Sequence, residues 1–261
     1  MPFKCWMLIP FLSVLLAGCT SRDGATSSNQ KQEMLIHSGA GIRPPVAEVA
    51  NVFGEENGVD IVTNYAGSEV LLSKIKLSKR GDIYIPGDQH YIDQASEADL
   101  ILSHKPLCYF VPTILVQKGN PKGIKGLEDL VKPGIKLGLG DAKACAIGRK
   151  CKKIFKKNGL AWEDIEKNLE FQCVTVNELG IQIKLKSLDA VIVWDAVAKY
   201  YAEHGDEVPI PKEKNVISTV PAGVLSFTAN KELAEKFVAF ASSERGRAIF
   251  KKHNYQVDLP D

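Results

Sequence analysis

Three turns of small and hydroxyl residues, each followed by an amphipathic helical segment, carry the groups best suited to chemistry. They are residues 38–41 (Ser-Gly-Ala-Gly), 66–68 (Ala-Gly-Ser) and 140–148. Each turn offers backbone N–H groups that lack helical partners at the positive end of a helix dipole, and glycine allows a ligand to approach the backbone closely. A single turn of this kind is usually an N-cap. Three of them together predict an anion-binding site.

The segments around these turns alternate between short apolar strands and helices. Strands at 34–37, 59–65 and 82–85 are separated by helical segments, which predicts a parallel sheet with helices on both faces. The alternation continues after a long strand at 110–116, where the internal proline suits a segment that passes from one sheet to another.

We therefore predict an α/β protein with two lobes, each a mixed, mainly parallel sheet flanked by helices. Two crossing strands form the hinge. The first lobe is expected to comprise residues 34–112 and 224–261, and the second residues 113–223. Ligands of such proteins bind in the cleft, at the carboxyl ends of strands and the amino ends of helices.

The N-terminal residues 1–18 are typical of a secretory signal peptide. One positive charge, Lys4, precedes an apolar stretch that is too short to span a bilayer, and small residues follow it. Leu16-Ala17-Gly18-Cys19 resembles the bacterial lipobox, in which the cysteine is acylated after cleavage. We expect a lipid anchor on Cys19 as the only membrane attachment, a flexible polar tether at 19–33, and an extracytoplasmic location on a bacterial membrane.

Composition narrows the possible partners. The chain has 33 basic and 31 acidic residues, a formal charge of +2, so no global field favours nucleic acid. Outside the signal and the lipidated position, four cysteines remain: Cys108, Cys145, Cys151 and Cys173. An even number in an exported protein permits disulfides in three pairings, and buried free thiols remain open. The sequence contains no C-x-x-C spacing, so the cysteines give no indication of a zinc site.

The order and spacing of several segments resemble the periplasmic molybdate- and tungstate-binding proteins of ABC importers. These segments are Ile36-His37-Ser38-Gly39-Ala40, Tyr65-Ala66-Gly67-Ser68, Asp82-Ile83-Tyr84-Ile85-Pro86-Gly87-Asp88 and Asp189-Ala190-Val191-Ile192-Val193-Trp194. The resemblance covers nearly all of the mature chain. It implies a monomeric receptor, without enzymatic activity or cofactor, that delivers an oxyanion to an ABC permease and its ATPase.

The resemblance also implies the ligand-binding residues. Ser38 and Ser68 match the two family serines, and the backbone N–H groups near Ile147 and Val176 match those of two second-lobe turns. Trp194 occupies the position of a family tyrosine. Because its indole offers one donor and no acceptor, the oxyanion would be contacted differently there, or by a neighbour such as Asp195 or Tyr200.

Other interpretations remain. The same donors suit sulfate or phosphate. A metal-ion receptor would use His37, Tyr65 and Asp88. An exported enzyme is disfavoured, since the chain has no Gly-x-Ser-x-Gly elbow. Three basic residues near the turns, Arg43, Arg149 and Lys150, would raise the local potential, although such residues more often form a solvated helix face.

Overall fold

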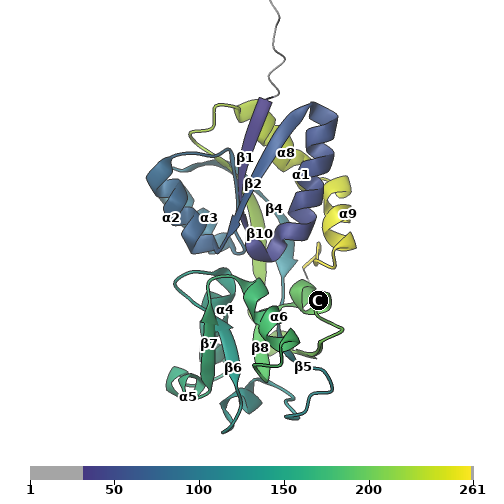
Figure 1. The fold of residues 1–261 in the computed structure, drawn as a ribbon. Helices are drawn as coiled ribbons and strands as arrows, with labels where there is room; N and C mark the ends of the chain where they lie inside the picture. Colours follow the sequence, from purple (N-terminus) through teal and green to yellow (C-terminus); the bar gives the residue numbers. More distant parts are fainter. Residues whose placement is uncertain (1–31, 260–261) are drawn as a thin grey trace, which may run out of the picture. The chain divides into compact units, whose positions relative to one another are not determined.

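The computed structural model describes residues 32–259, whose helices and strands build two α/β lobes (Figure 1). The predicted signal peptide, Cys19 and most of the predicted tether lie outside the described residues. Within residues 32–259, no helix has both the length and the apolar character that crossing a membrane requires.

The first lobe is built on a five-stranded sheet. Its order is β2 (Val59–Ala66), β1 (Gln32–Gly39), β3 (Ile83–Ile85), β10 (Ser218–Leu225) and β4 (Ile101–Phe110). β1 is parallel to β2 and β3, whereas β10 is antiparallel to β3 and β4. Four strands therefore run in one direction and only β10 runs in the other.

The second lobe repeats this arrangement. Its sheet has the order β7 (Leu169–Cys173), β6 (Leu137–Gly140), β8 (Ala190–Trp194), β5 (Pro112–Gln117) and β9 (Gly205–Pro209). β6 is parallel to β7 and β8, and β5 is antiparallel to β8 and β9. Again one strand, β5, opposes the other four. The prediction of two mixed, mainly parallel sheets is confirmed.

Helices flank both sheets. The first lobe carries α1 (Arg43–Asn57), α2 (Ser68–Ser78), α3 (Gln89–Glu97), α8 (Lys231–Ala241) and α9 (Glu244–Lys252), and the short 3-10 helix η1 (Ala40–Ile42). The second carries α4 (Ala146–Lys157), α5 (Trp162–Glu166), α6 (Val176–Lys184) and α7 (Asp195–Tyr200), with the 3-10 helices η2 (Leu127–Val131) and η3 (Lys212–Lys214). Each of the longer helices turns an apolar face toward a sheet, as Val46, Val49 and Phe53 of α1 do.

The chain passes between the sheets at points that differ from the predicted ones. The expected continuous strand at 110–116 is two strands in different sheets, because β4 ends at Phe110 and β5 begins at Pro112. Proline is tolerated better at the first position of a strand than inside it, because it has no N–H group to donate to a neighbouring strand. Residues 218–223, expected in the second lobe, belong to β10, since antiparallel pairing sets Ser218 opposite Phe110 and brings both passages to one end of the first sheet.

Candidate functional site

A small cavity lies where the loops of the two lobes meet. Gly39, Ser68 and Gly87 line it from the first lobe, and Ile147, Val176 and Trp194 line it from the second, with eight further residues between them. Its volume is about 20 Å³, which is room for little more than one water molecule. None of the residues that line it carries a charged side chain. The lobes thus enclose a compact space whose walls are neutral.

The structure brings four of the five predicted site residues to this cavity: Ser68, Ile147, Val176 and Trp194. The fifth, Ser38, lies one residue away from the cavity wall. It is fully buried at the end of β1, and within the described chain the only hydrogen bond of its hydroxyl group is a long one, 3.4 Å, to the carbonyl of Gly39. Gly39 itself lines the cavity.

Three helices begin at the cavity, which explains why small residues gather there. Ser68, Ala146 and Val176 are the first residues of α2, α4 and α6, and all three line the cavity. The first turn of a helix carries N–H groups without intrahelical acceptors, and the helix dipole makes that end positive. The cavity is therefore surrounded by donors and by positive potential, although it has no cationic wall.

Ser68 is oriented as a donor. Its Oγ accepts a hydrogen bond from the Gly87 N–H at 3.0 Å, and the buried hydroxyl of Tyr84 donates to the Ser68 carbonyl at 2.7 Å. Because the lone pairs of Oγ already face a donor, its own hydrogen remains available for an acceptor in the cavity. The Ser68 hydroxyl can thus donate to an acceptor in the cavity while both of these hydrogen bonds are kept.

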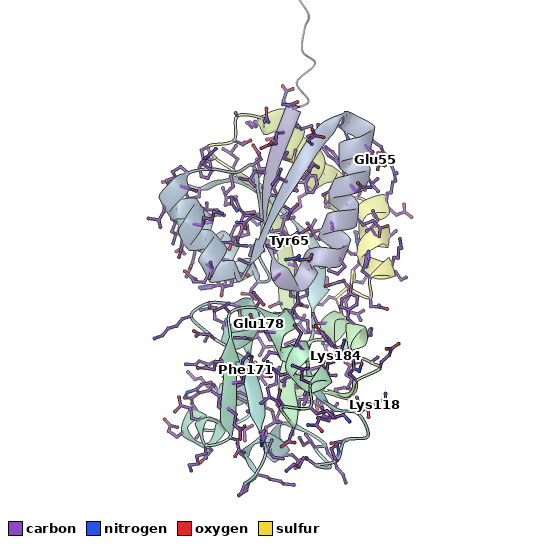
Figure 2. The ribbon with its side chains drawn as sticks, in the orientation of Figure 1. Glu55, Tyr65, Lys118, Phe171, Glu178 and Lys184 are labelled. Atoms are coloured by element: carbon purple, nitrogen blue, oxygen red, sulfur yellow. The ribbon has the colours of Figure 1, made fainter. Side chains whose placement is uncertain are left out.

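Thr175, which was not among the predicted site residues, fixes the start of α6. Its N–H and its hydroxyl both donate to Glu178 Oε1, at 2.9 and 2.7 Å, in a capping box. Figure 2 shows Glu178 on α6 in the second lobe and Tyr65 at the end of β2 in the first. The T-x-x-E spacing was the sequence signal that could have identified this cap.

The lobes touch closely around Gly67. A Cβ atom at this position would lie 2.5 Å from the carbonyl oxygens of both Ala144 and Val174, which belong to the second lobe. The Glu69 N–H donates to Ala144 O at 3.2 Å, and Asn177 Nδ2 donates to Ala40 O at 3.1 Å. These contacts describe a closed cleft, in which a side chain at residue 67 has no space.

Trp194 forms an aromatic wall with a residue of the other lobe. Its ring stacks on Phe110, with centroids 4.5 Å apart and an interplanar angle of 23°. Tyr255 also packs against Phe110, with ring centroids 5.7 Å apart, and donates from its hydroxyl to Gly41 O at 2.6 Å. Tyr255 could not be identified as part of the site from the sequence, because nothing in its local sequence connects it with residue 41.

Asp195 and Tyr200, the alternatives to the family tyrosine, do not line the cavity. Asp195 Oδ2 accepts from Gln256 Nε2 at 3.2 Å, and burial raises the pKa of this carboxyl group. Tyr200 donates to the carbonyl of His253 at 3.2 Å. Both side chains therefore serve contacts with the C-terminal segment, which leaves Trp194 as the residue at that wall.

The three candidate metal ligands do not come together. His37 Nε2 lies 2.9 Å from Arg80 O, Asp88 forms an ion pair with Lys150, and Tyr65 lies beneath Arg43, whose guanidinium carbon is 4.4 Å from the ring centroid. No group of three or more His, Cys, Asp and Glu side chains within residues 32–259 is arranged to hold a metal ion. The geometry gives these residues separate partners.

The sequence permitted either disulfides or free thiols for the four cysteines, and the structure shows free thiols. Cys108, Cys145, Cys151 and Cys173 are all free and buried. Cys145 lines the cavity, and burial raises the pKa of its thiol to about 11. It is therefore a neutral, weakly polar part of the wall at physiological pH.

Two α/β lobes with one opposing strand each, closed over a cavity at three helix N-termini, define a solute receptor of the bilobal type. The chain belongs to the family of bacterial extracellular solute-binding proteins, whose model matches residues 34–256.

Known proteins of this kind are similar over most of the chain. The molybdate-binding protein ModA of Escherichia coli is 26% identical, over 86% of this chain and 89% of its own. The molybdate-binding protein of Azotobacter vinelandii has a TM-score of 0.71 at 16% identity, with 87% and 100% of the two chains covered. The sulfate-binding protein SubI of Mycobacterium tuberculosis has a TM-score of 0.76 at 17% identity, with 87% and 88% covered. The resemblance to molybdate-binding receptors is confirmed.

Proposed function

We propose that this protein is a receptor that captures a tetrahedral oxyanion, molybdate or tungstate, between its lobes and presents it to an ABC permease and its ATPase. On this proposal it acts as a monomer outside the cytoplasm, with a lipid anchor at Cys19. The observation that carries the proposal is the convergence of three helix N-termini and the donor-oriented Ser68 on one enclosed cavity.

Neutral donors suffice for such a ligand. A dianion that enters a closed cleft loses its hydration, and fixed N–H and O–H groups must replace it. Backbone dipoles and hydroxyl groups do so without a cationic ligand residue. The absence of any carboxylate among the residues that line the cavity also favours an anion over a metal cation.

Calorimetric titration of the mature, delipidated protein tests this proposal. Molybdate, tungstate, sulfate, phosphate and divalent metal ions are titrated separately under the same conditions. We expect the tightest binding for molybdate or tungstate. Binding to a metal cation alone, or turnover of a substrate, would contradict the proposal.

Sulfate is the second candidate, since a sulfate-binding protein shares the fold and the same donors fit any tetrahedral dianion. The titration separates the two candidates, because tighter binding of sulfate than of molybdate would reassign the ligand.

Serine variants test the site itself. Ser68→Ala removes a donor to a charged ligand and leaves the Gly87 N–H without its acceptor, so we expect about 10- to 100-fold weaker binding. Ser38→Ala measures the contribution of the serine next to the cavity wall. Ser73→Ala, at an exposed position of α2, is the matched control. Unchanged affinity in the Ser68 variant would remove this residue from the site.

A further inference from the structure

Helix α4 carries two successive basic residues, Arg149 and Lys150, about one turn from the cavity. The two side chains have different partners. Lys150 Nζ lies 2.6 Å from Asp88 Oδ2, and both side chains are less than 10% exposed. Arg149 forms no ion pair within residues 32–259; its guanidinium carbon lies 5.9 Å from the ring centroid of Tyr91 in the first lobe. The positive charge of Lys150 is therefore compensated locally, and that of Arg149 is not.

Arg149 and Tyr91 each have one buried polar atom without a hydrogen-bond partner. Arg149 Nε and the Tyr91 hydroxyl are buried without a hydrogen-bond partner, and only Asp195 Oδ1 shares this condition in the described part of the chain. Buried polar groups without partners are rare because each costs free energy. Two such atoms in one contact between the lobes suggest that the contact is retained for a reason other than packing.

Arg149 lies within one helical turn of the cavity wall. Ala146 and Ile147 line the cavity, and Arg149 follows two residues after Ile147 on the same helix. The helical rise places its Cα only about 3 Å further along the axis. Long side chains in helices lean toward the N-terminal end, which here is the cavity end. On the opposite side, Tyr91 lies on α3, four residues after Gly87 of the cavity wall.

We propose that Arg149, held against the ring of Tyr91 when the lobes are closed, determines specificity by charge and makes the receptor favour doubly charged over singly charged tetrahedral oxyanions. This inference rests on the proposed oxyanion site and goes beyond it. Backbone N–H groups and the Ser68 hydroxyl can bind either kind of anion, because they recognise oxygen atoms. The Coulomb attraction of an uncompensated guanidinium, in contrast, is twice as strong for a dianion as for a monoanion at the same position.

Tungstate and perrhenate test the inference, because both are tetrahedral and of nearly the same size but carry two and one negative charges. Their dissociation constants are measured calorimetrically at low salt for the wild type and for Arg149→Gln. We expect the substitution to weaken tungstate binding about 100-fold and perrhenate binding about 10-fold. The ratio of the two constants then falls about tenfold. Arg149→Lys, which keeps the charge, restores most of the ratio.

Two further variants serve as a substitute and a control. Arg149→Met keeps an apolar stem against Tyr91 and replaces the Gln variant if that variant does not fold. Lys152→Gln removes one charge from the same helix, at an exposed position over Trp162, and leaves the ratio unchanged. Equal weakening of both anions by the Arg149 variants, or no weakening, would overturn the inference. A wild-type protein that binds no oxyanion would instead refute the proposed function.

Discussion

Asp88 and Lys150 form a buried ion pair that joins the two lobes, with 2.6 Å between Oδ2 and Nζ. Asp88 caps α3 in the first lobe, and Lys150 lies on α4 in the second. Ser218 of β10 donates to Asp88 at 2.6 Å, and Lys150 donates to Ile217 O at 3.1 Å. The pair thus ties both lobes to the segment where the chain returns to the first sheet.

The charges of this pair depend on each other. Burial alone would raise the pKa of Asp88, but the charge of Lys150, together with hydrogen bonds from Lys150, Ser218 and the His90 N–H, holds the pKa below its ordinary value. A depressed carboxylate pKa stabilises the closed form at neutral pH, and the stabilisation is lost only as the pH falls through that depressed pKa. The Asp88 carboxyl group is therefore ionised at neutral pH, whereas burial lowers the pKa of its partner Lys150.

Lys150→Met should shift the protein toward an open form. The substitution leaves the Asp88 carboxylate buried without its partner, a cost of about 3–5 kcal/mol that opening of the lobes relieves. We expect at least tenfold weaker oxyanion binding and a larger radius of gyration by small-angle scattering. Lys118→Met is the control, because it removes an exposed ion pair with Asp206. Figure 2 shows Lys118 in the second lobe. Wild-type affinity in the Lys150 variant would show that the pair does not hold the lobes together.

Sequence patterns were sufficient for the architecture because periodicity is a local property. The apolar segments that alternate with helical segments in the sequence form the strands of the two sheets. The turns at 66–68 and 146–148 mark the starts of two helices at the cavity. The local sequence of a strand does not determine which sheet the strand joins. The chain leaves the first sheet at Val111 and rejoins it at Ser218, earlier than predicted. Both points follow from the pairing of β4 with β10, which lie more than 100 residues apart in the chain.

The parts of the site that the sequence did not reveal are contacts between distant segments. Tyr255 reaches Gly41 across 214 residues, and Lys150 reaches Asp88 from the other lobe. Arg149 and Lys150 looked like members of a solvated basic helix face, because the run of basic residues at 149–153 resembles one. Only the approach of the first lobe makes these two positions part of the interface.

Gly67→Ala should block closure without disturbing the first lobe. The backbone at this residue has φ −64° and ψ 147°, which alanine adopts freely. A methyl group there would lie 2.5 Å from two carbonyl oxygens of the second lobe. Overpacking of this kind costs about 1–3 kcal/mol, so we expect oxyanion affinity to fall about 10- to 100-fold by calorimetry.

The control for Gly67→Ala is Gly126→Ala, where the backbone is extended and a Cβ would approach only the flexible Glu128 carboxylate, at 3.2 Å. Both variants should keep the unfolding temperature of the ligand-free wild type within a few degrees. A Gly67 variant with unchanged affinity would mean that the ligand is held in a more open arrangement.

Trp194 should report ligand binding by its fluorescence. Its indole lines the cavity and stacks on Phe110, so an oxyanion changes its surroundings directly. Trp194→Phe keeps a ring against Phe110 but removes the N–H donor, and we expect about tenfold weaker binding together with loss of the ligand-induced fluorescence change. Trp162→Phe is the control, since Trp162 lies on α5 and contacts Lys152 rather than the cavity. A fluorescence change that survives in the Trp194 variant would place the ligand elsewhere.

His37 should make the stability of the first lobe depend on pH. Burial lowers the pKa of its imidazole, although the contact of Nε2 with Arg80 O, at 2.9 Å, opposes this effect. Nδ1 lies 3.2 Å from the amide nitrogen of Asn64, which suits a neutral ring that accepts there and donates at Nε2. Because the folded pKa is lower than the unfolded one, the unfolded chain takes up the proton first as the pH falls. The stabilisation is therefore complete above about pH 6.5 and is lost as the pH falls toward the folded pKa.

Urea denaturation between pH 5 and pH 8 measures this dependence. We expect the free energy of unfolding to decrease toward the acidic end, and His37→Gln to flatten the decrease, because glutamine does not titrate. Part of the slope should persist in that variant, since burial also lowers the pKa of His90. His104→Gln, at an exposed position of β4, is the matched control and should keep the wild-type slope. An unchanged slope in the His37 variant would show that the imidazole is protonated equally in the folded and unfolded chains.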